Sequence, residues 1–524
     1  MGNPIETEIK LAASPSMLEH LRGHPKLAGA DATGTIITTY FDTADRRLRR
    51  RDAALRIRVG SKGRQQTLKL ASPGESAVHR VEWNASIDGD FPDLAAFPAR
   101  PRATLVQMLK GNRLEPIGLT RIARTTRRVR FGGSLIEIAF DEGTIEAGDC
   151  REAVGEIELE LMEGRFADVI DLVLELPLGP ELAWSLASKS NRCQGLAFGS
   201  PPAAILARPV GLRRSMDAAC GFQAIAWNCL DQLLANYPIV IASGDPEAVH
   251  QSRVAVRRLC AAFSLFGDVV DDGDADVLHA EIRAVAAGLA PARDLHVLLG
   301  RVEALVRAEE ADGAALLAHL AARRDAAMQA AKAMLAAEPF QRLLFRFAAW
   351  IEGGRWLAQK AETGGSLPLA PFAARALSRR RRRLQKAGGP DGGGPDGGWG
   401  VIDMADAERH RLRICVKKLR YAADFFAPLF RGTARGGFVK GLAKLQDSLG
   451  QLNDMAVAAA GRDRLFADLD PITAARLAAR FDDVLERQGV ARRKLLKSAE
   501  RALSQVVDAP AWWKTHGGKI RQDE

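Results

Sequence analysis

The sequence lacks the features of a membrane-embedded or exported chain. It contains no run of about 18 apolar residues, which argues against a membrane span. The first residues, Met1 to Glu6, have neither the basic region nor the apolar core of a signal peptide. The six cysteines are scattered without a C-x-x-C pair, which disfavours a disulfide framework or a zinc site and favours reduced thiols. We therefore expect a cytoplasmic protein that does not enter a membrane.

Motifs of several enzyme classes are absent as well. There is no G-x-x-x-x-G-K-[ST] sequence, which excludes a P-loop nucleotide site, and the nine histidines include no H-E-x-x-H motif. Aromatic residues make up only 6% of the chain, with three tyrosines. This scarcity of base-stacking side chains disfavours nucleic acid as a partner.

Positive charge is unevenly distributed. The net charge is +10, yet residues 1–200 contain 27 basic and 27 acidic residues, so the whole excess lies in residues 201–524. A binding surface for an anionic partner is therefore expected in the C-terminal part.

The hydrophobic periodicity changes near residue 200. Before it, short runs such as Leu55–Val59 and Leu135–Phe140 alternate with period two, which is typical of strands, and after it the period is that of helices. We predict an α+β protein with a strand domain over residues 1–200, a linker over 201–212 and an all-α domain over 213–510. A Gly/Pro-rich loop at 388–400 divides the helical domain into halves of about 213–385 and 401–510.

An internal repeat relates these two halves. The segment from His250 to Leu259 aligns with that from His410 to Leu419, and Asp294 aligns with Asp454. Both alignments have the same offset of 160 residues. We therefore predict two repeated helical bundles.

The strands of the N-terminal domain carry charges of both signs. Glu6, Glu8 and Lys10 share one strand face by their spacing of two, as do Glu156, Glu158 and Glu160. So many charged faces make a shared polar interior conceivable, as in a closed barrel. Clustered carboxylates bind hard divalent cations, and clustered Arg and Lys bind phosphate oxygens. A phosphate chain with a metal ion would satisfy both groups.

Residues 1–200 resemble the CYTH family, also described as triphosphate tunnel metalloenzymes. The resemblance lies in Glu6-x-Glu8-x-Lys10, Tyr40-Phe41-Asp42-Thr43, Leu55-Arg56-Ile57-Arg58, the segments 136–143 and 156–161, and Ser188-Lys189-Ser190. It implies an eight-stranded antiparallel β-barrel, or tunnel, that hydrolyses triphosphates with Mg²⁺ or Mn²⁺. The sequence departs from the family at Met162, where a lysine is usual.

The resemblance also implies roles for individual residues. Catalysis is expected to depend on Glu6, Glu8 and Lys10. Metal binding is expected at Glu6 and Glu8 with Glu156 or Glu158, and at Glu160, with Asp141 as a further carboxylate. Phosphate binding is expected at six cations, namely Lys10, Arg56, Arg58, Lys69, Arg127 and Lys189. Arg124 is expected to lie on the surface.

Two helices of the C-terminal part carry a basic stripe. His250, Arg253 and Arg257 fall within about 60° of one another on a helix, opposite Val256, Leu259 and Ala262. The aligned helix has the same arrangement. These stripes resemble the CHAD family over about 213–510, which implies binding of polyphosphate. The expected binding residues are His250, Arg253, Arg257, Arg258, His410, Arg413, Lys417, Lys418 and Arg420, with the arginine run 379–383 adding to the surface.

A CYTH domain followed by a CHAD domain is a known arrangement in bacterial proteins. We therefore expect an inorganic triphosphatase with Mg²⁺ or Mn²⁺, inorganic triphosphate as substrate and polyphosphate as a further partner, in the cytoplasm or on polyphosphate granules. Two alternatives stay open at this point. One is a polyphosphate-binding protein without activity, and the other is an enzyme that acts on thiamine triphosphate or on ATP as a cyclase.

Overall fold

A computed structural model describes most of the chain: residues 5–60, 63–70, 78–199, 202–306, 310–362, 367–389, 400–430 and 435–514. The chain forms two compact units. The first comprises Met1–Arg208, Ala226–Ala255 and Lys332–Ala358, and the second Pro209–Ile225, Val256–Ala331 and Gln359–Glu524. Two helical segments therefore belong to the same unit as the N-terminal strands. The predicted boundaries at 200 and 213 stay predictions, and most of the predicted loop at 388–400 lies outside the described residues.

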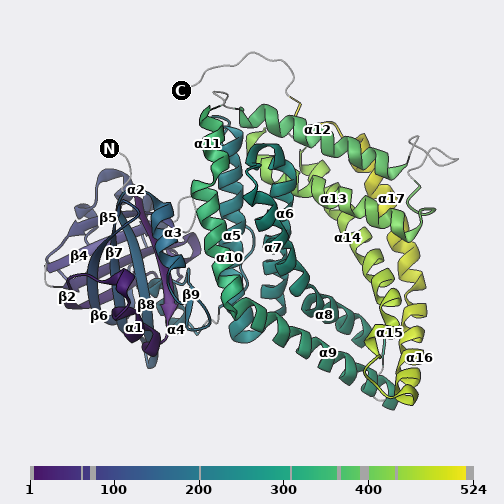
Figure 1. The fold of residues 1–524 in the computed structure, drawn as a ribbon, viewed down its shortest axis with the longest axis horizontal. Helices are drawn as coiled ribbons and strands as arrows, with labels where there is room; N and C mark the ends of the chain where they lie inside the picture. The colour runs from purple at the N-terminus through teal and green to yellow at the C-terminus, as the bar shows by residue number, and fades with distance from the viewer. Residues whose placement is uncertain are drawn as a thin grey trace. The chain divides into compact units, whose positions relative to one another are not determined.

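The strands of the first unit form one antiparallel sheet that closes on itself (Figure 1). Its order is β5-β4-β3-β2-β6-β7-β8-β1, and the pairing of β5 with β1 completes the ring. A ninth strand pairs with the end of β1. The predicted eight-stranded antiparallel tunnel is confirmed. The strands are β1 (Ile5–Ala13), β2 (Ala32–Asp42), β3 (Ala53–Gly60), β4 (Gly63–Leu70), β5 (His79–Ser86), β6 (Glu115–Phe131), β7 (Ser134–Ala147), β8 (Cys150–Glu163) and β9 (Leu182–Trp184).

The closed sheet has its polar face inside and its apolar face outside. On β1, Ile9 and Leu11 are fully buried, while Glu8 and Lys10 alternate with them on the opposite face. The outer apolar face is covered by short helices: Leu105 and Leu109 of α2, for example, pack in one cluster with residues of β3 and β4. The short helices are α1 (Pro15–Arg22), α2 (Ala99–Leu109), α3 (Phe166–Leu174) and α4 (Lys189–Ala197). This arrangement leaves the charged side chains facing the centre.

The rest of the chain is helical. The helices are α5 (Ala218–Ser243), α6 (Pro246–Val270), α7 (Asp274–Gly288), α8 (Ala290–Glu303), α9 (Ala311–Ala336), α10 (Glu338–Gly353), α11 (Arg355–Glu362), α12 (Leu369–Gly388), α13 (Asp406–Phe426), α14 (Arg435–Ala460), α15 (Arg462–Leu465), α16 (Pro471–Arg487) and α17 (Gly489–Asp508). No helix in the described ranges has an apolar stretch long enough to cross a membrane.

The predicted repeat has a counterpart in the helices. Helix α13 begins 160 residues after α6, and α16 begins 160 residues after α9. In both α6 and α13 the predicted core positions are buried: Val256 and Leu259 in the first, Val416 and Leu419 in the second. The repeated sequence thus folds into helices that begin at equivalent residues.

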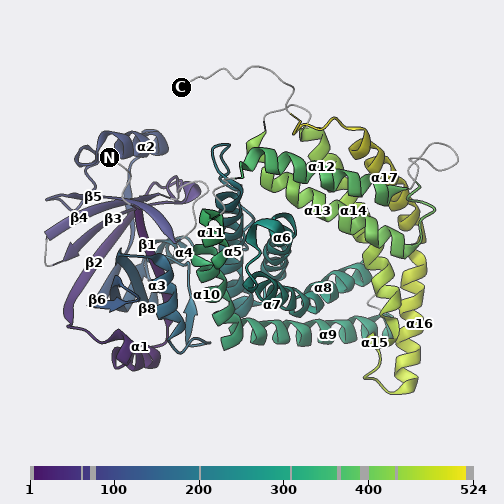
Figure 2. The ribbon, with the colours of Figure 1, turned by 45° about the horizontal axis from the view of Figure 1, so that its top comes forward.

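In the second unit, α12, α13, α14 and α17 lie side by side (Figure 2). Trp513 links two of these helices: it packs edge-on against Phe438 of α14 and donates a hydrogen bond to Ser378 of α12. A separate apolar cluster joins α8, α9 and α16 through residues such as Leu316, Leu320 and Phe481. Large buried side chains therefore hold each part of this unit together.

Candidate active site

A polar cavity of about 210 Å³ lies inside the closed sheet. Among the described residues it is lined by seven carboxylates (Glu6, Glu8, Glu82, Glu137, Asp141, Glu158 and Glu160) and by six cations (Lys10, Arg56, Arg58, Lys69, Arg124 and Lys189). The charges of opposite sign therefore nearly balance within one enclosed volume.

Strand register brings these groups together. In the antiparallel pairing of β1 with β8, Lys10 lies opposite Glu158 and Glu8 opposite Glu160. Residues directly opposite each other point to the same face, so the two charged triplets of the sequence meet inside the tunnel. On β6 and β7, Arg124 lies opposite Asp141 in the same way.

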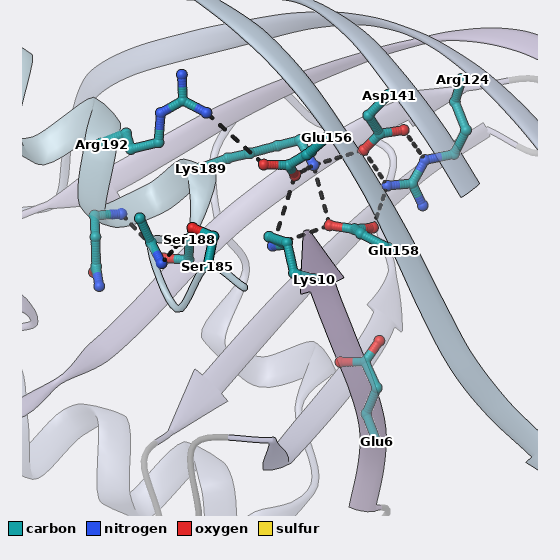
Figure 3. Close-up of polar contacts among 12 residues, drawn as sticks. Glu6, Lys10, Arg124, Asp141, Glu156, Glu158, Ser185, Ser188, Lys189 and Arg192 are labelled. Carbon is teal, nitrogen blue, oxygen red and sulfur yellow. Dashed lines mark hydrogen bonds and ion pairs between the residues drawn. The ribbon is translucent and has the colours of Figure 1, made fainter. Parts of the chain in front are cut away.

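Three carboxylates and three cations form one cluster of ion pairs (Figure 3). The Lys189 ammonium lies 2.6 Å from Asp141 and 3.1 Å from Glu158, and it also pairs with Glu156. Lys10 lies 3.0 Å from Glu158. The Arg124 Nη2 atom lies 2.5 Å from Asp141 and 2.6 Å from Glu158. We call these six residues the Lys189 cluster.

Charge pairing controls ionisation in the Lys189 cluster. Burial alone would raise the pKa of Glu158, but Lys189, Lys10 and Arg124 outweigh it and hold the pKa well below the usual value. Burial alone would lower the pKa of Lys189, but the three carboxylates raise it above the usual lysine value. Glu158 and Lys189 are therefore both ionised at neutral pH.

A second group of charges lies around Glu6. Lys69 lies 2.6 Å from Glu6 and 2.5 Å from Glu82, and Arg56 lies 3.5 Å from Glu82. Burial, together with the neighbouring carboxylate of Glu8, raises the pKa of Glu6 to about 7. Burial alone would raise the pKa of Glu82, but Lys69 and Arg56 lower it to about 2. Burial is therefore the main cause of the raised pKa of Glu6, and Lys69 offsets it only in part.

Arg58 differs from the other cations of the cavity. Its Nε atom is buried without a hydrogen-bond acceptor, and no carboxylate of the described residues lies within ion-pair distance of its guanidinium. The nearby Arg56, burial and Arg124 together lower the pKa of Arg58 to about 10. Such a cation is well placed to bind an anion that enters the cavity.

Most residues predicted from the sequence are brought together here. Glu6, Glu8, Lys10, Arg56 and Arg58 line the cavity, as do Lys69, Asp141, Glu158, Glu160 and Lys189. Glu156 is buried behind this lining and pairs with Lys189.

Arg127 is the exception. It lies outside the cavity, pairs with Asp31 and donates a hydrogen bond to the carbonyl of Arg22 at 2.7 Å. Arg124, which was expected on the surface, takes a place inside. The two residues are three positions apart on one strand and therefore point to opposite faces. Two further carboxylates, Glu82 and Glu137, line the cavity. Neither is predicted from the sequence, although Glu82 follows the period-two pattern of its strand.

The basic stripes of the helical part are placed as follows. His250, Arg253 and Arg257 are partly exposed on α6, and His410 is exposed on α13, where it bonds to Asn453 at 2.7 Å. Lys418 is exposed, while Arg413, Lys417 and Arg420 are partly exposed.

Two predicted members of the basic surface are instead buried. Arg258 is only 6% exposed and lies over the ring of Phe425. In the arginine run 379–383, Arg380 is buried and donates to Ser264, and Arg381 donates to the carbonyl of Val507 at 2.6 Å. Arg258 and Arg380 are therefore buried in the helical fold rather than exposed on the basic surface, which corrects the prediction of their place, while Arg381 is partly exposed.

Two parts of the chain match the models of known protein families. Residues 4–193 match the model of the CYTH domain, and residues 224–463 match that of the CHAD domain. The chain is a CYTH domain followed by a CHAD domain. Both resemblances predicted from the sequence are therefore confirmed.

Individual proteins also match. The chain is 34% identical over 199 residues to an inorganic triphosphatase of Haemophilus influenzae, a match that covers 37% of this chain and 55% of the relative. The chain thus spans about half the length of that relative. A solved CHAD domain from the plant Ricinus communis is 28% identical, with a TM-score of 0.49, and covers 58% of this chain and 97% of its own. PptA from Streptomyces chartreusis is 19% identical, with a TM-score of 0.37 and coverages of 57% and 100%.

Proposed function

We propose that the CYTH domain hydrolyses inorganic triphosphate with the help of Mg²⁺ or Mn²⁺. The observation that carries this proposal is the cavity in which seven carboxylates and six cations converge. Because these charges nearly balance, a phosphate chain alone would leave the cavity strongly negative. A phosphate chain that enters together with divalent cations would keep the balance.

The size of the cavity favours a compact substrate. Pockets for drug-sized ligands usually measure about 300–1,000 Å³, whereas this cavity measures about 210 Å³. Its lining is dominated by charged groups rather than by the apolar surface that a base or thiazole ring needs. Inorganic triphosphate therefore fits better than thiamine triphosphate or ATP. The resemblance to an inorganic triphosphatase supports the same choice.

The carboxylates fit a hard divalent cation. Oxygen atoms of Asp141, Glu156 and Glu158 all lie within 4.8 Å of one another, but the Lys189 ammonium pairs with all three of these carboxylates. We therefore assign the cation to a second set of carboxylates, Glu6 and Glu8 of β1 with Glu160 of β8, because carboxylate oxygens are the ligands that Mg²⁺ and Mn²⁺ prefer. When bound, the cation would neutralise charge on the phosphate oxygens and help to ionise water.

The cations of the chain would hold the substrate and stabilise the leaving group. Arg56 and Arg58 lie on one strand and face the cavity, where their guanidinium groups suit phosphate oxygens. Water attacks the terminal phosphorus, the bond to the bridging oxygen breaks, and pyrophosphate leaves with the bonding electrons. Lys10 and Arg124 are placed to offset the negative charge that grows on the phosphate oxygens.

The test is phosphate release from triphosphate by the full chain, with Mg²⁺ or Mn²⁺ added. A Glu6→Gln, Glu8→Gln double variant should lose activity by more than about 100-fold while keeping its fold. Glu19→Gln, which changes a carboxylate 78% exposed on α1, is the control. Unchanged release from the double variant would reject the metal assignment.

A second experiment identifies the substrate by comparing phosphate release from inorganic triphosphate, thiamine triphosphate and ATP. Wild-type protein that binds triphosphate without hydrolysing it would instead favour a binding protein.

For the CHAD domain we propose binding of polyphosphate along the basic stripes of α6 and α13. Support comes from the positive excess of this part and from partly exposed cations such as Arg253, Arg257 and Lys417. A location in the cytoplasm, or on polyphosphate granules, is part of this proposal.

A further inference from the structure

The segment that follows β9 connects the cavity with the helices of the same compact unit. Strand β9 pairs with β1, where Trp184 lies opposite Leu11, and the amide of Ser185 donates to the Lys10 carbonyl at 2.9 Å. Ser185, Leu186, Ser188 and Lys189 then line the cavity. Helix α4 begins at Lys189, and the Ser188 hydroxyl caps it by accepting from the amide of Asn191. The position of Lys189 is therefore set by a short, extended segment of chain.

The other side of this segment rests on aromatic side chains of two helices. The Trp184 indole stacks on the ring of Phe345 of α10, with ring centres 4.2 Å apart and an angle of 7° between the planes. The hydroxyl of Tyr237 of α5 donates to the Trp184 carbonyl at 2.5 Å. Trp184 and Tyr237 are each 1% exposed and Phe345 is completely buried. A stacked, hydrogen-bonded and almost completely buried contact therefore holds the residue five positions before Lys189.

Both helical residues lie in the part of the chain that matches CHAD, yet in the compact unit that contains the cavity. Neither is among the described residues that line the cavity. Trp184, which contacts both of them, is the residue that links them to the segment lining the cavity. The Lys189 cluster is sensitive to such an effect, because an ammonium held at 2.6 Å from Asp141 loses much of that interaction after a shift of about 1 Å.

We propose that Tyr237 and Phe345 are positioning residues that act through Trp184 to keep Lys189 among Asp141, Glu156 and Glu158. Helices from the CHAD sequence thereby complete the CYTH active site. The proposal rests on the proposed triphosphatase function for its kinetic consequence, but the positioning itself is a structural property that can be measured without turnover.

The first experiment measures amide hydrogen exchange in the full chain by mass spectrometry. Tyr237→Phe removes one hydroxyl, and Phe345→Leu removes the stacked ring. Both variants should speed exchange of the segment 185–190 by about tenfold or more, while the β6–β7 hairpin stays protected. The control is Phe347→Leu. This change also removes a buried ring from α10, but the ring of Phe347 contacts Trp350. Wild-type exchange of segment 185–190 in both variants would overturn the proposal.

The second experiment is a double-mutant cycle on phosphate release. Tyr237→Phe should lower kcat about tenfold, and Phe347→Leu should not. If Tyr237 acts through Lys189, adding Tyr237→Phe to Lys189→Gln should cause no further loss. Additive losses would overturn the proposal, as would fast exchange in Tyr237→Phe with unchanged kcat. Wild-type protein without turnover would reject the proposed function, and hydrogen exchange would then decide the positioning role alone.

Discussion

The ammonium nitrogen of Lys189 lies 2.6 Å from an oxygen of Asp141, a carboxylate that is completely buried. Removing one partner of a buried ion pair leaves the other charge without compensation, at a cost of about 3–5 kcal/mol. Lys189→Gln should therefore lower the free energy of unfolding by about 3 kcal/mol in the presence of EDTA. Added Mn²⁺ should restore part of the loss, because it can take the place of the ammonium among the three carboxylates. Chemical denaturation with and without metal measures both effects.

The matched control for Lys189 is Lys26. Its ammonium lies 3.4 Å from Glu175, and both side chains are about half exposed. Exposed pairs contribute about 0–1 kcal/mol, so Lys26→Gln should change stability by less than about 0.5 kcal/mol and show no response to Mn²⁺. Equal losses in the two variants would contradict the role given to the Lys189 cluster.

Arg124 and Arg127 provide a test of which face of β6 is the functional one. Arg124→Gln removes a cation that pairs with Asp141 and Glu158 inside the cavity. Phosphate release should fall by about 100-fold or more. Arg127→Gln removes a cation that bonds outside the cavity, so it should lower stability by about 1–3 kcal/mol and leave kcat within about threefold of the wild type. The reverse order of kinetic losses would show that the inner face has been assigned wrongly.

The same two arginines show how far the sequence predicts the site. Alternation along a strand is local, so the shared faces of Glu6, Glu8 and Lys10 follow from spacing alone. On β6, however, five arginines occupy both faces between residues 121 and 130. The alternation therefore does not show which face of β6 points inward. That face is identified only by the pairing of Arg124 with Asp141 on the next strand.

Other features depend on contacts between distant parts of the sequence. Trp184 packs on Phe345, which lies far along the chain in a different family domain, and no local pattern indicates this pair. The arginine run 379–383 indicates a concentration of positive charge but not which of its side chains are exposed. The burial of Arg380 depends on Ser264, a residue of another helix. The repeat was easier to predict, because equivalent polar residues recur at a constant offset.

Glu6 should make the stability of the folded chain fall as the pH rises. Burial and the charge of Glu8 raise its pKa in the folded chain to about 7, above the ordinary value of 4.5. The folded state therefore binds more protons than the unfolded state between these values. In EDTA, the stability due to Glu6 should be present at pH 4.5 and should be lost as the pH rises through about 7. Glu82, whose pKa is lowered to about 2, stays ionised throughout this range.

Unfolding free energies measured at pH 5 and pH 8 in EDTA test this expectation. The wild type should lose more stability over this interval than Glu6→Gln, which carries no titratable group at that position. Mn²⁺ should reverse the loss at pH 8, because a cation stabilises the ionised carboxylate. A loss of the same size in Glu6→Gln would show that other groups cause the pH dependence.

Arg257 and Arg381 separate binding from folding in the CHAD domain. The Arg257 Nε atom is buried without a hydrogen-bond acceptor in the described structure, while the rest of the side chain is partly exposed on the basic stripe. Arg381 instead donates hydrogen bonds to the carbonyls of Val507 and Ala509. Arg257→Gln should therefore weaken binding of long-chain polyphosphate about five- to tenfold and make it less sensitive to salt, because one fewer cation faces the polymer. Arg381→Gln should lower stability by about 1–3 kcal/mol and leave the affinity unchanged.

Titrations of both variants with polyphosphate at several salt concentrations, together with thermal unfolding, distinguish the two roles. Wild-type affinity in Arg257→Gln would show that the stripe of α6 is not part of the binding surface.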